Sequence, residues 1–214
     1  MKDCYYSRLV EFAHFDGIME IPYISRPNEF IIPEGLVPFS KRHYCSNSNY
    51  FICFYENDDE FIDFLISPEK YLDDLKKFAG VILPDPSLDY DMPLIVQLYH
   101  VYLSRAIGIW LQQNDIYAVV NVRWGDERTY TTNFIPEMVP FLGIEQDSII
   151  AIGTYGCSQG AEELEHLRNG LNVLIEQCHP RYVLVYGSFP KKIFQKYASQ
   201  TTFVHYPDWT THQH

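Results

Sequence analysis

Short apolar runs recur along the chain at intervals of about 30 residues, and helical segments lie between most of them. The runs are rich in β-branched and aromatic residues and lack polar alternation, which is typical of strands covered on both faces. Strands that alternate with helices predict a mostly parallel sheet built from right-handed βα units. The predicted strands are YFICFY (50–55), GVILP (80–84), YAVVNV (117–122), SIIAIG (148–153), RYVLVYG (181–187) and TTFVHY (201–206).

The segments between these strands carry the signals of helix boundaries. Residues 61–78 have helical register but contain Ser67 followed by Pro68, which predicts two helical pieces. The next helix is long and apolar, and we expect Asp91 to cap it and Pro93 to lie in its first turn. Further helices are predicted at 134–141, 161–178 and 191–197.

Two architectures fit this order of elements, a (β/α) barrel and an open doubly wound sheet. An additional strand near 18–24 brings the predicted strands to seven. We favour a small or irregular (β/α) barrel because polar residues follow the end of nearly every strand. The expected organisation is one α/β domain over 50–206, with an irregular N-terminal segment (1–49) packed on it and a loose tail (207–214).

Charge and cysteine content exclude several classes of protein. A formal net charge of −12 repels phosphate backbones, so general nucleic-acid binding is not expected, whereas a basic protein could meet an acidic face. The five cysteines form no CxxC pair, which favours a reducing compartment over a disulfide framework or a zinc site. The chain starts without an apolar secretory segment, and Gln97 and Arg105 interrupt the apolar stretch 92–111. We therefore expect a cytoplasmic protein that does not span or bind a membrane.

Charged residues gather after two of the predicted strands. In either architecture the functional face lies beyond the C-terminal ends of the parallel strands. Asp85 follows the second strand, and the sequence RWGDER follows the third. Asp85, Asp126 and Glu127 are candidate catalytic acids or bases, and they could hold a divalent metal ion through oxygen ligands. Arg123 and Arg128 are candidate ligands of a carboxylate or phosphate group.

The RWGDER loop also has a purely structural interpretation. In it, Arg123 pairs with Asp126 across a turn in which Gly125 adopts a positive φ. Both interpretations stay open at this point. Further candidate ligand-binding residues at the strand ends are Trp124, Thr154 and Ser188.

The glycine-rich stretch GTYGCSQG (153–160) lies between a strand and the helix at 161–178. It matches neither a dinucleotide nor a P-loop fingerprint, so we favour a glycine turn with Ser158 as the helix N-cap. Cys157 is a candidate nucleophile at a helix N-terminus, although a buried, inert cysteine is the commoner case.

Four stretches occur in a fixed order, FAGVILPDPSLDYDMP, VVNVRWGDERTY, IAIGTYGC and LVYGS. In combination they resemble a family of bacterial, phage and mobile-element proteins that is catalogued as a domain of unknown function. The resemblance covers about residues 50–206. It implies a cytoplasmic protein, in the host cell if the gene is phage-borne, and it implies no catalytic residue.

Two functions are compatible with these patterns. In the first, the chain is an enzyme whose carboxylates and arginines at the strand ends act on a small anionic or nucleotide-like substrate in a hydrolytic or phosphoryl-type reaction. In the second, it is a non-catalytic binding protein. It would then sequester a ligand or engage a host protein, such as a defence component, through its acidic, Tyr-rich surface.

Overall fold

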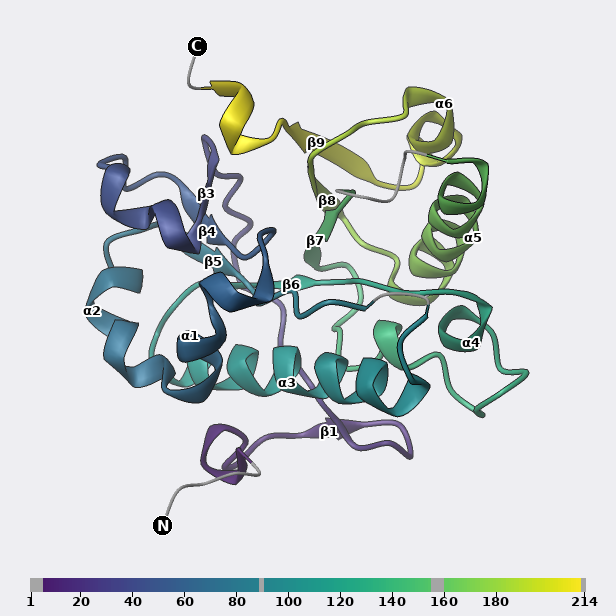
Figure 1. Ribbon diagram of the computed structural model, residues 1–214, viewed down its shortest axis with the longest axis horizontal. Coiled ribbons are helices and arrows are strands. Elements are labelled where there is room, and N and C mark those ends of the chain that lie inside the picture. The colour runs from purple at the N-terminus through teal and green to yellow at the C-terminus, as the bar shows by residue number, and fades with distance from the viewer. Residues whose placement is uncertain (1–5, 89–90, 155–159, 213–214) are drawn as a thin grey trace.

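Seven short strands form one parallel sheet, and their order in the sheet is their order along the chain (Figure 1). The computed structural model describes residues 6–88, 91–154 and 160–212. All six strand pairs are parallel. The strands are β3 (Leu36–Pro38), β4 (Phe51–Cys53), β5 (Gly80–Ile82), β6 (Ala118–Asn121), β7 (Ile149–Gly153), β8 (Tyr182–Tyr186) and β9 (Thr202–Tyr206).

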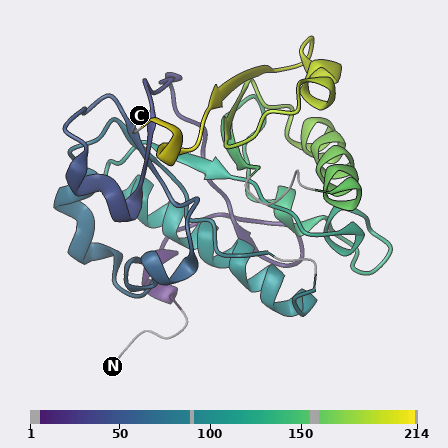
Figure 2. The same ribbon diagram turned by 45° about the horizontal axis from the view of Figure 1, so that its top comes forward.

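The sheet curls into a half-barrel (Figure 2). A strictly sequential order has no switch point, so every right-handed crossover places its helix on the same, convex face. The prediction of a barrel-type sheet rather than a doubly wound one is therefore confirmed, and the sheet forms half of a barrel. The two outer strands approach each other through the C-terminal turn η7 (Trp209–His212), which lies beside β3. Tyr206 donates its hydroxyl hydrogen to the Pro33 carbonyl at 2.8 Å.

The seventh strand is not the one that was predicted near 18–24. Ile21–Pro22 (β2) instead pairs with Phe15–Asp16 (β1) in a small antiparallel hairpin. Pro22 cannot donate to a sheet ladder, which disfavours a central position for this segment. The strand that joins the sheet is β3, whose Pro38 is tolerated because β3 is an edge strand.

The helices cover the convex face of the half-barrel, and their boundaries follow most of the sequence signals. The chain breaks at Ser67 as expected, but the predicted cap at Asp91 is wrong because the long helix starts later, with Pro93 at its N-cap. Only a 3-10 turn forms in the region of the helix predicted at 134–141. The α-helices are α1 (Ile62–Ile66), α2 (Leu72–Leu75), α3 (Leu94–Gln113), α4 (Glu127–Tyr130), α5 (Ala161–Cys178) and α6 (Lys191–Phe194). The 3-10 helices are η1 (Ser7–Leu9), η2 (Phe39–Tyr44), η3 (Asp58–Glu60), η4 (Pro68–Tyr71), η5 (Val139–Phe141), η6 (Gln195–Tyr197) and η7.

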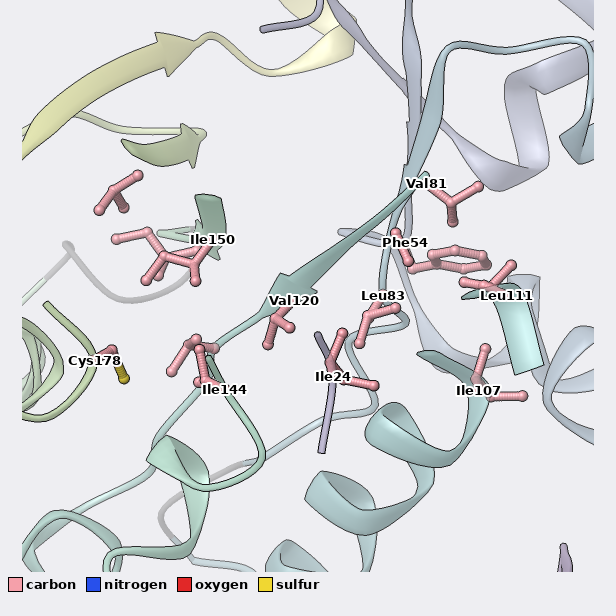
Figure 3. Packing of buried hydrophobic residues seen from close by; sticks show 14 of the residues in the cluster. Ile24, Phe54, Val81, Leu83, Ile107, Leu111, Val120, Ile144, Ile150 and Cys178 are labelled. Atoms are coloured by element: carbon pink, nitrogen blue, oxygen red, sulfur yellow. The ribbon is translucent and has the colours of Figure 1, made fainter. Parts of the chain in front are cut away.

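Alternation along each strand divides the core into two layers. Outward side chains such as Val81, Val120 and Ile150 pack against the helices (Figure 3). Inward side chains such as Ile82 and Val119 fill the concave side of the sheet. Both layers are apolar, which explains why the strands lack polar alternation in the sequence.

Helix α3 lies between the sheet and the N-terminal segment (Figure 1). Among the described residues, it is the helix that is long and apolar enough to cross a membrane by length and composition. It contacts β6 on one side, and β2 and η1 on the other. Burial on two sides accounts for its apolar sequence.

Arg105 of α3 is 1% exposed and is the largest fully buried side chain. Its guanidinium donates to the carbonyls of Asn121 at 2.8 Å, Pro140 at 3.0 Å and Leu142 at 3.3 Å. Burial lowers the pKa of Arg105 to about 10, so the side chain is still charged near neutral pH. The guanidinium joins α3, the end of β6 and the segment that leads to β7.

We expect Arg105→Met to destabilise the fold by about 3 kcal/mol or more, because three buried carbonyls would lose their donor. Urea denaturation monitored by circular dichroism measures this change. Arg168 is exposed on α5, and Arg168→Met should change the free energy of unfolding by less than about 0.5 kcal/mol. Similar small effects for both variants would show that the Arg105 hydrogen bonds contribute little.

Candidate functional site

A cavity of about 580 Å³ opens at the C-terminal ends of the strands. Strands β3 to β8 each contribute to its wall, either with their last residues or with the loop that follows. The cavity therefore lies where (β/α) folds hold their functional groups. The wall residues from these six strand ends include Pro38, Tyr55, Asp85, Arg123, Gly153 and Tyr186.

Asp85 is the buried carboxylate in the wall of this cavity, and it is 5% exposed. One of its oxygens accepts from Asn121 Nδ2 at 2.7 Å, and the other accepts from Arg123 Nη1 at 2.7 Å. The Tyr55 hydroxyl donates to Asn121 Oδ1 at 3.0 Å, which orients the amide so that its NH₂ group faces Asp85. Neighbouring side chains thus hold this carboxylate in one position.

Two stacked tyrosines form one side of the cavity wall. The rings of Tyr55 and Tyr186 lie 5.0 Å apart and are nearly parallel. Burial, and next the charge of Asp85, raise the pKa of Tyr55 well above its ordinary value, so its phenol stays protonated and donates. The Tyr186 hydroxyl accepts from the backbone N–H of Trp209 at 3.0 Å, which attaches the C-terminal segment to the cavity.

Gly153 makes room for this stack. A Cβ atom at Gly153 would lie 2.6 Å from the ring of Tyr55, closer than such contacts normally come. Its backbone does not have a positive φ, so space rather than conformation requires the glycine. The absence of a side chain on β7 lets Tyr55 reach across toward Asn121 on β6.

We expect Gly153→Ala to cost about 1–3 kcal/mol, because the stacked Tyr55 ring must move to admit the methyl group. The penalty should shrink when Tyr55 is first truncated to alanine, since the clash is then gone. A double-mutant cycle on the free energy of unfolding tests this coupling. Equal penalties in both backgrounds would mean that something other than Tyr55 occupies the space.

The rim of the cavity is acidic. Glu56 accepts from the backbone N–H and the hydroxyl of Ser40, and thereby joins the ends of β4 and β3. Asp58 accepts from the backbone N–H and the hydroxyl of Ser87, and thereby joins the loops after β4 and β5. These hydrogen bonds hold both carboxylates at the mouth of the cavity.

The structure does not bring the three predicted metal ligands together. Asp126 is the N-cap of α4 and accepts from the Arg128 backbone N–H at 2.9 Å and from Arg128 Nη2 at 2.8 Å. Glu127 is exposed, and neither acidic residue of this pair lies in the cavity wall with Asp85. Within residues 6–88, 91–154 and 160–212, no group of three His, Cys, Asp or Glu side chains is arranged to hold a metal ion.

The structural interpretation of RWGDER correctly predicted an ion pair within the loop, but it named the wrong arginine. The loop does contain an internal ion pair, yet Asp126 pairs with Arg128, while Arg123 reaches Asp85 on the neighbouring strand end. Gly125 does not adopt the expected positive φ. The loop therefore divides into Arg123, which faces the cavity, and a capped turn that leads the chain away from it.

The other predicted ligand-binding residues lie outside the cavity wall. Trp124 donates from Nε1 to the His166 carbonyl at 3.0 Å and packs against α5. Thr154 is fully buried, and its hydroxyl donates to the Ser188 carbonyl at 2.7 Å. These contacts join the ends of neighbouring elements. Helix α5 has Gly160 at its N-cap, and the predicted cap Ser158 and candidate nucleophile Cys157 lie outside the described residues.

Several cavity residues were not singled out from the sequence. Tyr55 and Tyr186 belong to strand runs that were interpreted only as core, and so does Asn121, which is not in the cavity wall but donates to Asp85. Trp209 lies in the tail that was expected to be loose, yet it lines the cavity. Asn121 offered the one available signal, because it is a polar residue inside an otherwise apolar strand.

Asp126 should stabilise α4 in a pH-dependent way. Burial opposes its ionisation, but hydrogen bonds from the Arg128 side chain and backbone outweigh this effect and lower the pKa of Asp126. Its contribution is therefore present above the unfolded-state pKa of about 3.9 and disappears as the pH falls through the lower folded-state value.

We expect Asp126→Ala to cost about 1–2 kcal/mol at neutral pH, and Asp126→Asn to cost less because asparagine also caps helices well. Urea denaturation across the acid range measures both. The difference in the free energy of unfolding between wild type and Asp126→Asn should decrease as the pH falls through the folded-state pKa of Asp126. The exposed Asp73→Asn is the control, and a pH-independent difference at position 126 would contradict the ion-pair contribution.

Comparison with known proteins identifies relatives of the chain. The family described as "Domain of unknown function (DUF4417)" matches residues 13–207. The Gene 1 protein of Mycobacterium phage L5 is 31% identical over 171 residues, which cover 78% of this chain and 71% of the phage protein. The Gene 1 protein of Mycobacterium phage D29 is 28% identical over 171 residues, which cover 78% of this chain and 60% of that protein. No solved structure matches the chain significantly.

Proposed function

We propose that this chain, which belongs to the DUF4417 family of proteins with a domain of unknown function, binds a small polar ligand at the C-terminal mouth of its half-barrel. One observation carries the proposal: a buried carboxylate, Asp85, lies in the wall of a large cavity and is held in place by Asn121 and Arg123. Asp85 is the group that anchors the ligand.

The geometry around Asp85 supports binding. Each of its oxygens accepts one hydrogen bond from the described residues, and an ionised carboxylate can accept about four, so it retains capacity for a ligand. The cavity volume of about 580 Å³ falls in the range of small-molecule sites. The hydrogen-bonded chain from Tyr55 through Asn121 orients the carboxylate before a ligand arrives, which lowers the entropic cost of binding.

An enzyme that uses Asp85 as an acid or base is the second candidate. It is favoured by the position of Asp85 at the strand ends, where (β/α) enzymes hold catalytic groups. Of the three predicted catalytic carboxylates, Asp85 is the one in the cavity wall, so this candidate depends on it. The predicted anionic or nucleotide-like substrate has less support, because Arg123 is already paired with Asp85.

The phage relatives suggest where the protein acts. We place it in the cytoplasm of a host cell, as a ligand-sequestering or host-directed protein. Cys45, Cys53 and Cys178 are free thiols, and burial raises the pKa of Cys178 to about 12, which keeps this thiol unreactive. Free thiols suit a reducing compartment.

We expect a thermal-shift screen of small polar metabolites to find compounds that stabilise the wild type. At a ligand concentration of about 100 Kd the melting temperature should rise by roughly 5–10 °C. Asp85→Asn should abolish the shift relative to its own unliganded melting temperature, because the anchoring charge is lost.

Asp126→Asn is the matched control, since it also removes a carboxylate from an arginine pair but lies outside the cavity wall. The ligand should raise the melting temperature of Asp126→Asn as much as that of the wild type. Ligands that stabilise Asp85→Asn as well as the wild type would refute binding at this site. If a stabilising ligand is chemically converted, and if this conversion requires Asp85, the result would favour the enzyme.

A further inference from the structure

The cavity carries a large excess of negative charge. Its wall includes one partly buried ion pair, Asp85 with Arg123 at 2.7 Å, which contributes little net charge. The other cationic side chain in the wall is the exposed Lys41. Against it stand the carboxylates Glu56, Asp58, Asp59, Glu60 and Asp208. A concave site lined by one sign of charge attracts ligands of the opposite sign.

Neutral donors hold three of these carboxylates. Glu56 is bound by Ser40, and Asp58 by Ser87, through backbone N–H groups and hydroxyls. Asp208 accepts from the backbone N–H of Thr210 at 2.9 Å and from its hydroxyl at 2.8 Å. The hydrogen bonds from Ser40 and Ser87 fix Glu56 and Asp58 without supplying a counter-charge. The negative field of the cavity is therefore built into the fold.

This field reaches the aromatic wall. Burial is the main cause that raises the pKa of Tyr186, and the nearby carboxylates of Asp208 and Glu56 raise it further. The Tyr55 ring lines the same cavity and stacks on Tyr186. Aromatic faces next to carboxylates are typical of sites for organic cations, because the ring quadrupole also attracts positive charge.

Trp209 provides an independent sign of a missing partner. Trp209 is one of the residues of the cavity wall, and its indole N–H is buried without an acceptor among the described residues. A buried donor without an acceptor is costly, and native structures rarely retain one. An acceptor oxygen on a ligand would satisfy this group after a small shift of the C-terminal segment.

We infer that the ligand is an organic cation in which an amine or guanidinium group is joined to a small polar body with an acceptor oxygen. The inference rests on the proposed ligand-binding function of the same cavity and names the ligand class. The cationic group lies against the carboxylates and the Tyr55 ring, and the acceptor faces Trp209. A free small molecule or a basic side chain of a protein could present this chemistry.

The first test compares argininamide with citrullinamide, its uncharged analogue of nearly the same shape, by isothermal titration calorimetry on the full chain. We expect argininamide to bind at least about tenfold more tightly, because charge-assisted hydrogen bonds are stronger than neutral ones. Its affinity should fall between about 20 mM and about 300 mM salt as the field is screened. Equal binding of the two probes, or binding of neither, overturns the cationic class.

Substituted variants test whether argininamide binds in the cavity. Asp85→Asn should weaken argininamide binding about tenfold, and Asp59→Asn combined with Glu60→Gln should weaken it several-fold. Both rim positions are exposed, so the double variant should fold even if Asp85→Asn does not. Asp73→Asn combined with Glu162→Gln removes the same charge at exposed positions outside the cavity wall and should leave binding unchanged. Equal losses in the two double variants would indicate attraction by net charge and overturn the inference.

Two further probes distinguish a failure of this inference from a failure of the proposed function. They also distinguish a free small cation from a protein side chain as the source of the ligand. Inorganic phosphate or citrullinamide that binds in an Asp85-dependent way, while argininamide does not, would support the cavity as a site and refute the cation. A capped Gly-Arg-Gly peptide that binds more tightly than argininamide would identify a protein side chain as the source. A peptide that binds equally or more weakly would identify a free small cation.

Discussion

The strictly sequential pairing of parallel strands is the constraint on which the rest of this structure depends. Because each right-handed crossover returns on the same side, all the strand-connecting helices pack on one face, and the sheet curls around its other face. The inward side chains then converge. A doubly wound sheet with the same elements would bury both faces under helices and leave no concave mouth at the strand ends.

The candidate site forms where side chains from several strand ends converge at the mouth of the half-barrel. Tyr55 follows β4, while Asn121, Gly153 and Tyr186 are the last residues of β6, β7 and β8, and the four side chains or backbones meet at this end of the sheet. The contact between Tyr55 and Asn121 depends on Gly153, because a side chain on β7 would occupy the space of the tyrosine ring. That contact in turn orients the amide that holds Asp85. The position of the Asp85 carboxylate, in the loop after β5, thus depends on the absence of a side chain at Gly153 of β7.

Much of the architecture could be predicted from local patterns. The continuous apolar strands, the break at Ser67 and the amphipathic α5 follow from rules that act within a few residues. The edge strand β3 could not, because a three-residue strand that contains a proline has no distinctive pattern. Asp85 and Arg123 were identified because strand ends in parallel sheets share one face. Asp126 and Glu127 were included by the same rule, but the turn that starts α4 takes both out of the cavity wall.

By itself, the sequence determined the α/β class, the parallel sense of the sheet and the acidic character of the molecule, because composition and short-range periodicity control these properties. The tertiary structure decided which charged residues face one another. Arg123 and Arg128 are chemically equivalent in the sequence, but the former bonds a carboxylate across the sheet and the latter bonds one within its own turn. Only the curl of the sheet and the start of α4 at Glu127 separate the two, and both arise from packing between elements far apart in the chain.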